Sequence, residues 1–131
     1  MEIAIKEAEK SIKKGDIPVG AVIVENDKII SKAYNTREQK NKITGHAEIN
    51  AIEKVSKKKK TWHLNDCELY VTLEPCDMCK EVIKQTHIKK VYFLAPQTKK
   101  TNYKNFEMIQ INSNQKYVTM LQQFFQNKRT K

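Results

Sequence analysis

The stretch Glu68-Leu69-Tyr70-Val71-Thr72-Leu73-Glu74-Pro75-Cys76-Asp77-Met78-Cys79 decides the fold of this chain. Its first six residues form a compact β-favouring run, which is typical of a buried central strand. Glu74-Pro75 ends that strand, and because proline is tolerated in the first turn of a helix, a helix is predicted from Cys76 to about Thr86. An apolar run at residues 91–95 predicts the next strand. The stretch therefore begins a strand–helix–strand unit.

The residues near the N-terminus predict one helix and one hairpin. Apolar residues recur at helical spacing from Met1 to Ile12, and Gly15 follows them as a helix stop. β-favouring runs at residues 18–24 and 28–34 flank a short turn that contains Asn and Asp. Such a turn between two β-favouring runs predicts an antiparallel hairpin.

A second helix is predicted between the hairpin and the central strand. Residues 35–44 are polar and show no apolar period, so they predict a loop that leads to a helix start at about Gly45 or His46. This helix ends in Ser56 and the lysine run at residues 57–60, where cations complement the negative end of the helix dipole. The lysine run has a second interpretation, a contact with RNA phosphates, but we prefer a solvated helix end.

The C-terminal third shows fainter patterns. Residues 96–116 have no clear period, and the apolar residues between Val118 and Phe125 predict a short C-terminal helix or turn that ends in a basic tail at residues 127–131. Two strand–helix–strand steps after a hairpin indicate an α/β protein, specifically a three-layer α/β/α sandwich with a mixed central sheet. Because no Pro/Gly/Ser-rich linker divides the chain, residues 1–131 are predicted to form a single domain.

Lysine dominates the charge of the chain. The 25 basic and 15 acidic residues give a formal net charge of +10. This excess favours polyanionic partners such as nucleic acid or an anionic membrane surface, although a merely solvated basic surface accounts for it equally well. No apolar run approaches the roughly 20 residues of a membrane span, and the N-terminus lacks the apolar core of a signal peptide. We therefore expect a soluble, cytoplasmic protein with no membrane partner.

Two cysteines and one histidine indicate a metal site. Cys76 and Cys79 lie three residues apart at the start of a predicted helix, which points both sulfurs the same way and favours thiolates. His46, at the start of the other predicted helix, adds an imidazole nitrogen. Such a His-Cys-Cys set suits one Zn²⁺ ion per chain, with the fourth tetrahedral position open for water as in catalytic sites.

The same residues also allow two interpretations other than a catalytic zinc site. A closed structural zinc site needs a fourth protein ligand, and the candidates, none at an obvious finger-like spacing, are His63, His87 and Cys67. Cys67 precedes an apolar run, so a buried and chemically idle thiol is its preferred interpretation. Thioredoxin-like redox proteins use the same Cys-x-x-Cys spacing, but their motif follows the first strand and does not need a His-x-Glu pair.

Glu48 lies two residues after His46 on the same opening helical turn. Taken alone, it is a carboxylate stabilised by the helix dipole. Beside a zinc site it acquires a chemical use, because zinc lowers the pKa of bound water toward ~7 and a nearby carboxylate can accept and relay the proton. Glu48 is therefore the candidate catalytic residue.

The order His-x-Glu followed by Pro-Cys-x-x-Cys is the signature of zinc-dependent nucleobase deaminases. The chain resembles the cytidine deaminase-like superfamily and, within it, most closely the bacterial tRNA adenosine deaminases. The blocks that carry this resemblance are Ile17-Pro18-Val19-Gly20-Ala21-Val22, Ala33-Tyr34-Asn35, Gly45-His46-Ala47-Glu48-Ile49 and Leu69 to Cys79. The resemblance implies a cytidine deaminase-like fold and hydrolytic deamination of the wobble adenosine of a tRNA anticodon loop to inosine, with release of ammonia.

The resemblance also implies residue roles. His46, Cys76 and Cys79 hold zinc, and Glu48 shuttles protons while activated water attacks C6 of adenine. Asn35 hydrogen-bonds the substrate nucleoside, although a local backbone bond accounts for it equally well from the sequence alone. The other residues implied to contact the RNA are Ala47, Phe124, Phe125, Lys128 and Arg129. The alternative for the two phenylalanines is core packing, and we expect at least one of them to pack inside. Relatives are typically homodimers, so a homodimer is expected.

Three departures from the family pattern accompany this resemblance. Lys80-Glu81-Val82 follows the second cysteine where small residues are usual, Gly45 stands where alanine is common, and residues 96–103 replace an acidic residue and a glycine-rich loop. Two other functions stay open. A deaminase of free cytosine- or guanine-type bases, nucleosides or nucleotides needs the same zinc centre without an extended basic surface. A zinc-stabilised RNA-binding module, which is not an enzyme, leaves Glu48 idle.

Overall fold

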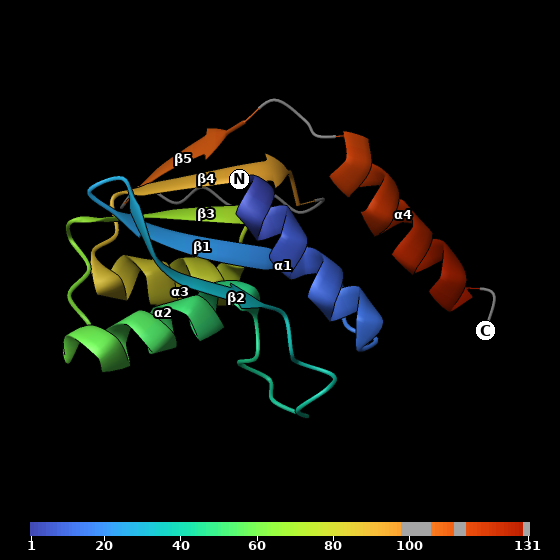
Figure 1. The fold of residues 1–131 in the computed structure, drawn as a ribbon, viewed down its shortest axis with the longest axis horizontal. Coiled ribbons are helices and arrows are strands. Elements are labelled where there is room, and N and C mark those ends of the chain that lie inside the picture. Colours follow the sequence, from blue (N-terminus) through green and yellow to red (C-terminus); the bar gives the residue numbers. More distant parts are fainter. Residues whose placement is uncertain (98–105, 112–114, 130–131) are drawn as a thin grey trace.

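A computed structural model describes residues 1–97, 106–111 and 115–129, with residues 128 and 129 described by their backbone alone. In chain order, the helices and strands are α1 (Glu2–Lys13), β1 (Gly20–Glu25), β2 (Lys28–Tyr34), α2 (Ala47–Lys59), β3 (Cys67–Leu73), α3 (Asp77–Thr86), β4 (Lys90–Ala95), β5 (Glu107–Gln110) and α4 (Gln115–Arg129) (Figure 1).

The strands form one mixed sheet in the order β2-β1-β3-β4-β5. β1 pairs antiparallel with β2 and with β3, whereas β3, β4 and β5 run parallel. The predicted hairpin is confirmed, and its turn residues Asn26 and Asp27 both have positive φ angles, of 50° and 63°. Asn and Asp tolerate this conformation better than other non-glycine residues, which explains why the hairpin turns at this point.

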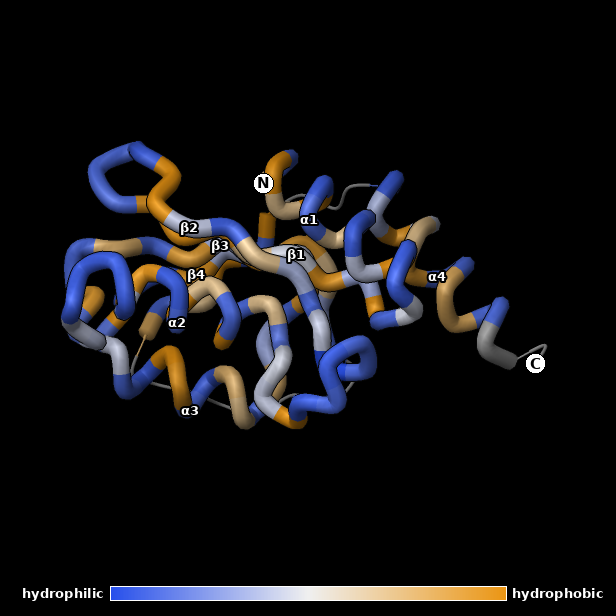
Figure 2. Tube along the Cα trace, turned by 60° about the horizontal axis from the view of Figure 1, so that its bottom comes forward, coloured by the Kyte–Doolittle hydropathy of each residue, from blue (hydrophilic) through white to orange (hydrophobic). Residues whose placement is uncertain are grey.

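Two apolar cores lie on opposite faces of the sheet, which confirms the three-layer sandwich. One core joins the sheet to α2 and α3 through residues such as Val55 and Ile83, and the other joins it to α1 and α4 through Ile5, Ala8 and Tyr117. In Figure 1, α2 and α3 lie below the sheet. Figure 2 shows hydrophobic residues along the strands between the helical layers, and hydrophilic residues in the hairpin turn and in the loop between β2 and α2.

α1 packs against β1 at very short range. A Cβ atom added to Gly20 would lie 1.8 Å from the carbonyl oxygen of Ala4, so only glycine fits at this position. The buried hydroxyl of Ser11, farther along α1, donates a hydrogen bond to the carbonyl oxygen of Asn35, at 3.1 Å. α1 therefore holds both the start of β1 and the end of β2, the point from which the chain turns toward α2.

The structure adds to the sequence-based picture of the C-terminal third. Residues 96–116 show no clear period in the sequence, and Glu107–Gln110 within them form β5, parallel to β4 at the sheet edge. A strand of four residues is too short to show a clear alternation of polar and apolar side chains. The C-terminal segment, expected as a short helix or turn, is the 15-residue helix α4. Its apolar residues are interrupted by glutamines because one side of the helix is exposed.

Tyr117 anchors α4 to the rest of the molecule. The side chain is fully buried, and its hydroxyl donates a 2.8 Å hydrogen bond to the carbonyl oxygen of Pro18. Tyr117→Phe should lower the free energy of unfolding by about 1 kcal/mol, because the buried carbonyl loses a donor. Chemical denaturation measures this change. Tyr92→Phe is the control, since the Tyr92 hydroxyl bonds the Glu68 carboxylate at a partly exposed site. An equal or larger loss in that control would contradict the anchoring role of Tyr117.

No helix in the described part of the chain is long and apolar enough to cross a membrane.

Candidate metal centre

The N-terminal ends of α2 and α3 bring the predicted metal ligands together. His46 is the N-cap residue of α2, and Cys76 is the N-cap residue of α3, so both have extended backbone just before a helix. Cys79 lies in the first turn of α3 and is fully buried. Their ligand atoms all lie within 4.8 Å of one another, and this is the one group of three or more His, Cys, Asp or Glu side chains suited to a metal ion among the residues described.

The spacing of these atoms fits zinc. The Nδ1 atom of His46 lies 3.2 Å from the sulfur of Cys79 and 3.5 Å from the sulfur of Cys76. Zinc bonds of about 2.3 Å to sulfur and about 2.0 Å to nitrogen, at tetrahedral angles, separate such a nitrogen and sulfur by about 3.6 Å. One thiolate moves by only a few tenths of an ångström to meet that geometry. Soft sulfur ligands and an imidazole also favour zinc chemically over magnesium or calcium.

The other candidate ligands lie apart from this cluster. His63 and His87 stack on each other and on Trp62. Cys67 is buried, as expected for an idle thiol, and lies 3.5 Å from a carboxylate oxygen of Glu25. Burial and that carboxylate raise the pKa of the Cys67 thiol to about 11. A fourth protein ligand from these three residues is therefore excluded, and a closed structural zinc site built from them is not supported.

Hydrogen bonds join the three ligand side chains to one another. Hydrogen bonds from Cys79 and His46 lower the pKa of the Cys76 thiol to about 4. The hydrogen bond between His46 and Cys76 raises the pKa of the His46 imidazole. A hydrogen bond to Cys76, together with burial, raises the pKa of the Cys79 thiol. Metal ligands of this kind bind as thiolates and neutral imidazole, so zinc uptake should displace these shared protons.

Glu48 lies in the first turn of α2 and is almost completely buried, with 3% of its surface exposed. Burial raises the pKa of its carboxyl group, while a hydrogen bond from its own backbone N–H and the positive charge of His46 oppose that shift. A carboxyl group whose pKa is raised beside a metal site can both accept and return a proton near neutral pH. The predicted position of Glu48 beside the ligands, but outside the ligand set, agrees with the structure.

The raised pKa of Glu48 should make the stability of the zinc-free protein depend on pH. Folded protein holds this proton to higher pH than unfolded protein does, so the free energy of unfolding falls as pH rises through the folded pKa. Glu48→Gln removes this loss, and we expect the zinc-free variant to exceed the zinc-free parent in thermal stability at pH 8. The advantage should shrink toward pH 4, where Glu48 is neutral in both states. A difference that stays constant between pH 4 and pH 8 would argue against the shift.

His46, Cys76 and Glu48 line a pocket of about 300 Å³. It contains four of the residues predicted to contact substrate: Asn35, Ala47, Phe124 and Phe125. The side chains of Lys128 and Arg129, predicted for the same role, lie outside the described part of the structure. Pocket residues that the sequence did not single out include Asp16, Arg37, Glu74 and Gln97.

Asn35 makes the local backbone bonds that were weighed as its alternative role, and it also lines the pocket. Its amide nitrogen donates to the carbonyl oxygen of Ile17 at 3.2 Å, and its amide oxygen accepts from the N–H of Arg37 at 3.1 Å. An asparagine amide has two N–H donors and two acceptor lone pairs, so one donor and one acceptor stay available after these bonds. A local structural role and a contact with substrate are therefore compatible.

Asp16 holds the loop that follows Asn35. Its carboxylate is fully buried and accepts hydrogen bonds from the backbone N–H groups of Glu38, at 2.6 Å, and Gln39, at 3.2 Å. Gly45 closes the same loop, because a Cβ atom there would lie 3.0 Å from the backbone of Arg37 and from the carbonyl oxygen of Lys42. Gly45, which stands where alanine is more usual, thus lets the loop pack closely against the backbone just before His46.

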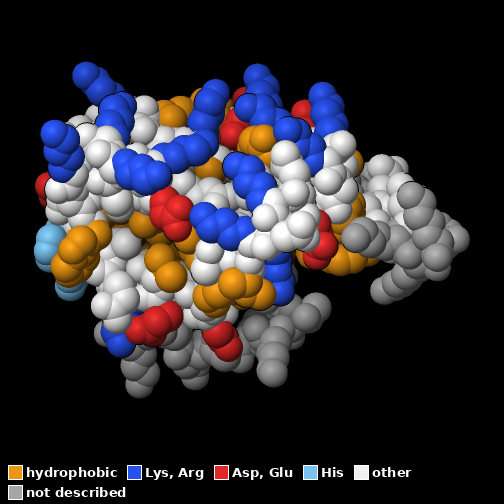
Figure 3. Space-filling view, turned by 90° about the horizontal axis from the view of Figure 1, so that it is seen from below, with side chains coloured by type: hydrophobic (Ala, Val, Ile, Leu, Met, Phe, Trp, Pro, Cys, Tyr) orange, Lys and Arg blue, Asp and Glu red, His pale blue; other side chains and the backbone are white. Residues whose placement is uncertain are grey.

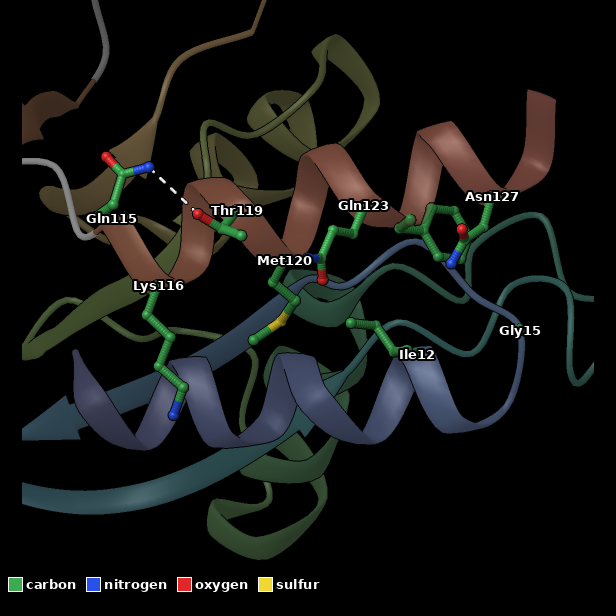
Figure 4. Close-up of a pocket in the computed structure, with 9 residues that line it drawn as sticks. Ile12, Gly15, Gln115, Lys116, Thr119, Met120, Gln123 and Asn127 are labelled. Carbon is green, nitrogen blue, oxygen red and sulfur yellow. Dashed lines mark hydrogen bonds between the residues drawn. The ribbon is translucent and has the colours of Figure 1, made fainter. Parts of the chain in front are cut away.

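Phe124 and Phe125 do not pack in the core, so that expectation was wrong. Phe124 is half-buried, Phe125 is 42% exposed, and their rings form an edge-to-face pair with centroids 5.7 Å apart. α4 extends past the edge of the sheet, so its last turns face the pocket and not an apolar core. Phe124 also lines a second groove, of about 920 Å³, between α1 and α4. Figure 4 shows Ile12 of α1 and Met120 of α4 facing each other across it.

A buried ion pair supports one wall of the pocket. The ammonium group of Lys80 lies 3.5 Å from the carboxylate of Glu74, and both side chains are largely shielded from water. The other carboxylate oxygen of Glu74 accepts the backbone N–H of Gln97 at 3.0 Å, and the Gln97 amide donates to the Glu74 carbonyl at 2.8 Å. Lys80 is one of the departures from the family pattern, and here it fixes the segment that follows β4.

The comparisons with known proteins agree with this site. Residues 1–95 match the family model described as the cytidine and deoxycytidylate deaminase zinc-binding region. A curated relative, the tRNA-specific adenosine deaminase of Aquifex aeolicus (strain VF5), is 45% identical over 95 residues. That alignment covers 72% of this chain and 63% of the relative, so the chain spans less than two thirds of that protein's length.

Solved structures add a fold-level comparison. A structure from studies of A-to-I editing by tRNA:A34 deaminases at the wobble position of transfer RNA superposes with a TM-score of 0.78 at 28% identity, covering 85% of this chain and 95% of the other. The guanine deaminase of Bacillus subtilis superposes with a TM-score of 0.69, also at 28% identity, covering 96% of this chain and 90% of the other.

Proposed function

The chain belongs to the cytidine and deoxycytidylate deaminase zinc-binding family, and from this premise we propose that it deaminates the wobble adenosine of a tRNA anticodon loop to inosine. The observation that carries the proposal is the placement of buried Glu48 beside the cluster of His46, Cys76 and Cys79, at the floor of a pocket. The choice of substrate is supported by a relative that is 45% identical to this chain and is named tRNA-specific adenosine deaminase.

In the proposed mechanism, His46, Cys76 and Cys79 hold one zinc ion per chain. When bound, the metal supplies water activated for attack at neutral pH. Glu48 accepts a proton as water adds at C6 of adenine and delivers a proton to the departing amine, so that water is consumed and ammonia leaves. The burial that raises the pKa of Glu48 suits a group that must take up and release a proton in one cycle.

The pocket residues hold the nucleoside. Asn35 has one amide donor and one acceptor left for the ribose or base, and Ala47 presents only a methyl group to the pocket, which leaves room for a flat ring. A nucleotide of a single-stranded loop can leave its stack at a cost of a few kcal/mol. Phe124 and Phe125, at the pocket rim, offer ring faces and edges to the neighbouring bases. Lys128 and Arg129 follow them on α4 and are proposed to contact the RNA backbone.

The test is to incubate the zinc-loaded protein with an arginine tRNA that carries an ACG anticodon and to measure inosine at the wobble position. We expect inosine to accumulate and the Michaelis constant to rise steeply with salt, because phosphate contacts weaken as counterions compete. If the tRNA is unchanged while free guanine or cytidine is deaminated with little dependence on salt, the protein is a deaminase of free bases or nucleosides. The structural likeness to a guanine deaminase makes that comparison necessary.

We propose further that the protein is a cytoplasmic homodimer and that residues 1–131 form one domain. The tRNA substrate supports the location, and the resemblance to homodimeric deaminases supports the assembly. Sedimentation equilibrium of the zinc-loaded protein should give twice the mass of one chain, and a single-chain mass at micromolar concentration contradicts the dimer.

A further inference from the structure

Most of the excess positive charge lies in one part of the chain. Residues 28–60, from β2 through α2, contain ten basic and three acidic residues, a net charge of +7 out of the +10 of the whole chain. One of the three acidic residues, Glu48, is buried in the active-site pocket and does not offset the surface charge. Figure 3, seen from the side of α2 and α3, shows basic side chains gathered along the upper half of this face.

Four of these lysines line a single hollow of about 300 Å³, which we call the lysine groove. Its wall includes Lys40, Lys42, Asn50, Glu53, Lys54 and Lys57. Two lysines have partners, because Lys42 lies 3.6 Å from Glu53 and Lys54 donates to the carbonyl oxygen of Lys32 at 2.9 Å. Within the described residues, Lys40 and Lys57 form no ion pair. The groove thus holds two exposed ammonium groups without a protein counter-charge.

The lysine groove and the active-site pocket lie on the two sides of one short segment. Tyr34 and Thr36 line the groove, whereas Asn35 and Arg37 line the pocket. Alternation of this kind is what an extended chain gives, because successive side chains point to opposite sides. The segment is held in place, since the N–H of Thr36 donates to the carbonyl oxygen of Gly45 at 2.8 Å. The groove and the pocket are thus separated by one extended segment, with Arg37 on the pocket side.

We propose that the lysine groove binds phosphates of the RNA backbone next to the nucleotide held in the pocket. This inference rests on the proposed function and adds the path of the RNA to it. Lysine ammonium groups contact phosphates as point charges and carry no base preference, so the groove positions the RNA and supplies affinity, while the pocket selects the base. The two ammonium groups of the groove that form no ion pair among the described residues can contact phosphates and release counterions without first breaking an ion pair.

The test compares two double variants that lose the same charge. Lys40→Gln/Lys57→Gln removes the unpaired cations of the lysine groove, and Lys84→Gln/Lys89→Gln removes two exposed lysines, one in the last turn of α3 and one in the loop that follows it. The affinity of each zinc-loaded variant for the arginine tRNA with an ACG anticodon is measured over a range of KCl concentrations, in a Glu48→Ala background that prevents turnover. Steady-state inosine formation is measured with Glu48 present.

The groove variant should lower the slope of log affinity against log salt by about two, one for each lysine that no longer neutralises a phosphate, and the control should leave the slope unchanged. With Glu48 present, the groove variant should raise the Michaelis constant and keep kcat. Equal slopes for the two variants overturn the groove while the deaminase proposal stands. A parent protein that binds the tRNA but forms no inosine overturns the proposed activity, and the slopes still decide the groove. A parent that does not bind the tRNA overturns both.

Discussion

Replacing Glu48 with alanine is expected to abolish deamination while leaving zinc bound. Glu48 is buried beside the three ligands and is not needed to complete their set. Positioned acid–base groups commonly contribute 10²–10⁴-fold to the rate, so kcat should fall by at least about 100-fold. Inosine formation on the tRNA measures the rate, and elemental analysis measures the metal. The predicted pattern is one zinc per chain with no detectable inosine.

Glu81→Ala is the matched control for this variant. Glu81 is also a helical glutamate, but it is exposed on α3 and bonds Gln85 rather than the metal cluster. It should keep both zinc and activity. Turnover that persists in Glu48→Ala would end the assignment of proton transfer to this residue. A protein that binds tRNA equally well with or without Glu48, and that never forms inosine, would instead be an RNA-binding module stabilised by zinc.

Removing either cysteine of the cluster is expected to remove the metal. Cys76→Ala or Cys79→Ala leaves two ligands, and the loss of affinity should exceed the roughly 10–100-fold that accompanies loss of a residue that merely supports a ligand. Zinc content should fall from one per chain to near zero, and deamination should be lost with it. Because metal affinity contributes to folding stability, the thermal midpoint of each variant should also become insensitive to a chelator.

Cys67→Ala tests whether this effect is specific to the cluster. Cys67 is buried and lies beside Glu25, away from the metal ligands. Its replacement removes a thiol from the core and should cost some stability, but the protein should still bind one zinc ion. An unchanged zinc content in both Cys76→Ala and Cys79→Ala would exclude those residues as ligands, and loss of zinc from Cys67→Ala alone would move the metal to another site.

The sequence predicted the metal cluster well because its geometry is mostly local. Two cysteines three residues apart in one helical turn must lie close together, and His46 needs only a helix start near them. The order of helices and strands was predictable for the same reason, since each element from α1 to β4 has its own apolar period. The structure adds the long-range part: β1 pairs antiparallel with both β2 and β3, so these two strands run in the same direction and the helices that follow them, α2 and α3, start at the same edge of the sheet.

Features that depend on contacts between distant residues were not predictable. β5 exists because its backbone pairs with β4, and four residues give no periodic signal of their own. The positions of Phe124 and Phe125 depend on Tyr117, whose hydroxyl reaches Pro18 across 99 residues of chain. In the sequence alone, Lys80 was notable only because small residues are usual at that position in the family. Its partner Glu74 became apparent only from the fold, as did the bond from Gln97 to that carboxylate.

The Glu74–Lys80 pair has a consequence for how this sequence can change. A single substitution at either position leaves one buried charge without its counter-ion, and loss of one partner of a buried pair is strongly destabilising. A joint replacement by uncharged residues of similar size can be nearly neutral. Exchange of this pair for uncharged residues therefore needs both positions to change together. A variant that changes only Glu74 or only Lys80 should therefore lose more stability than a variant that changes both residues.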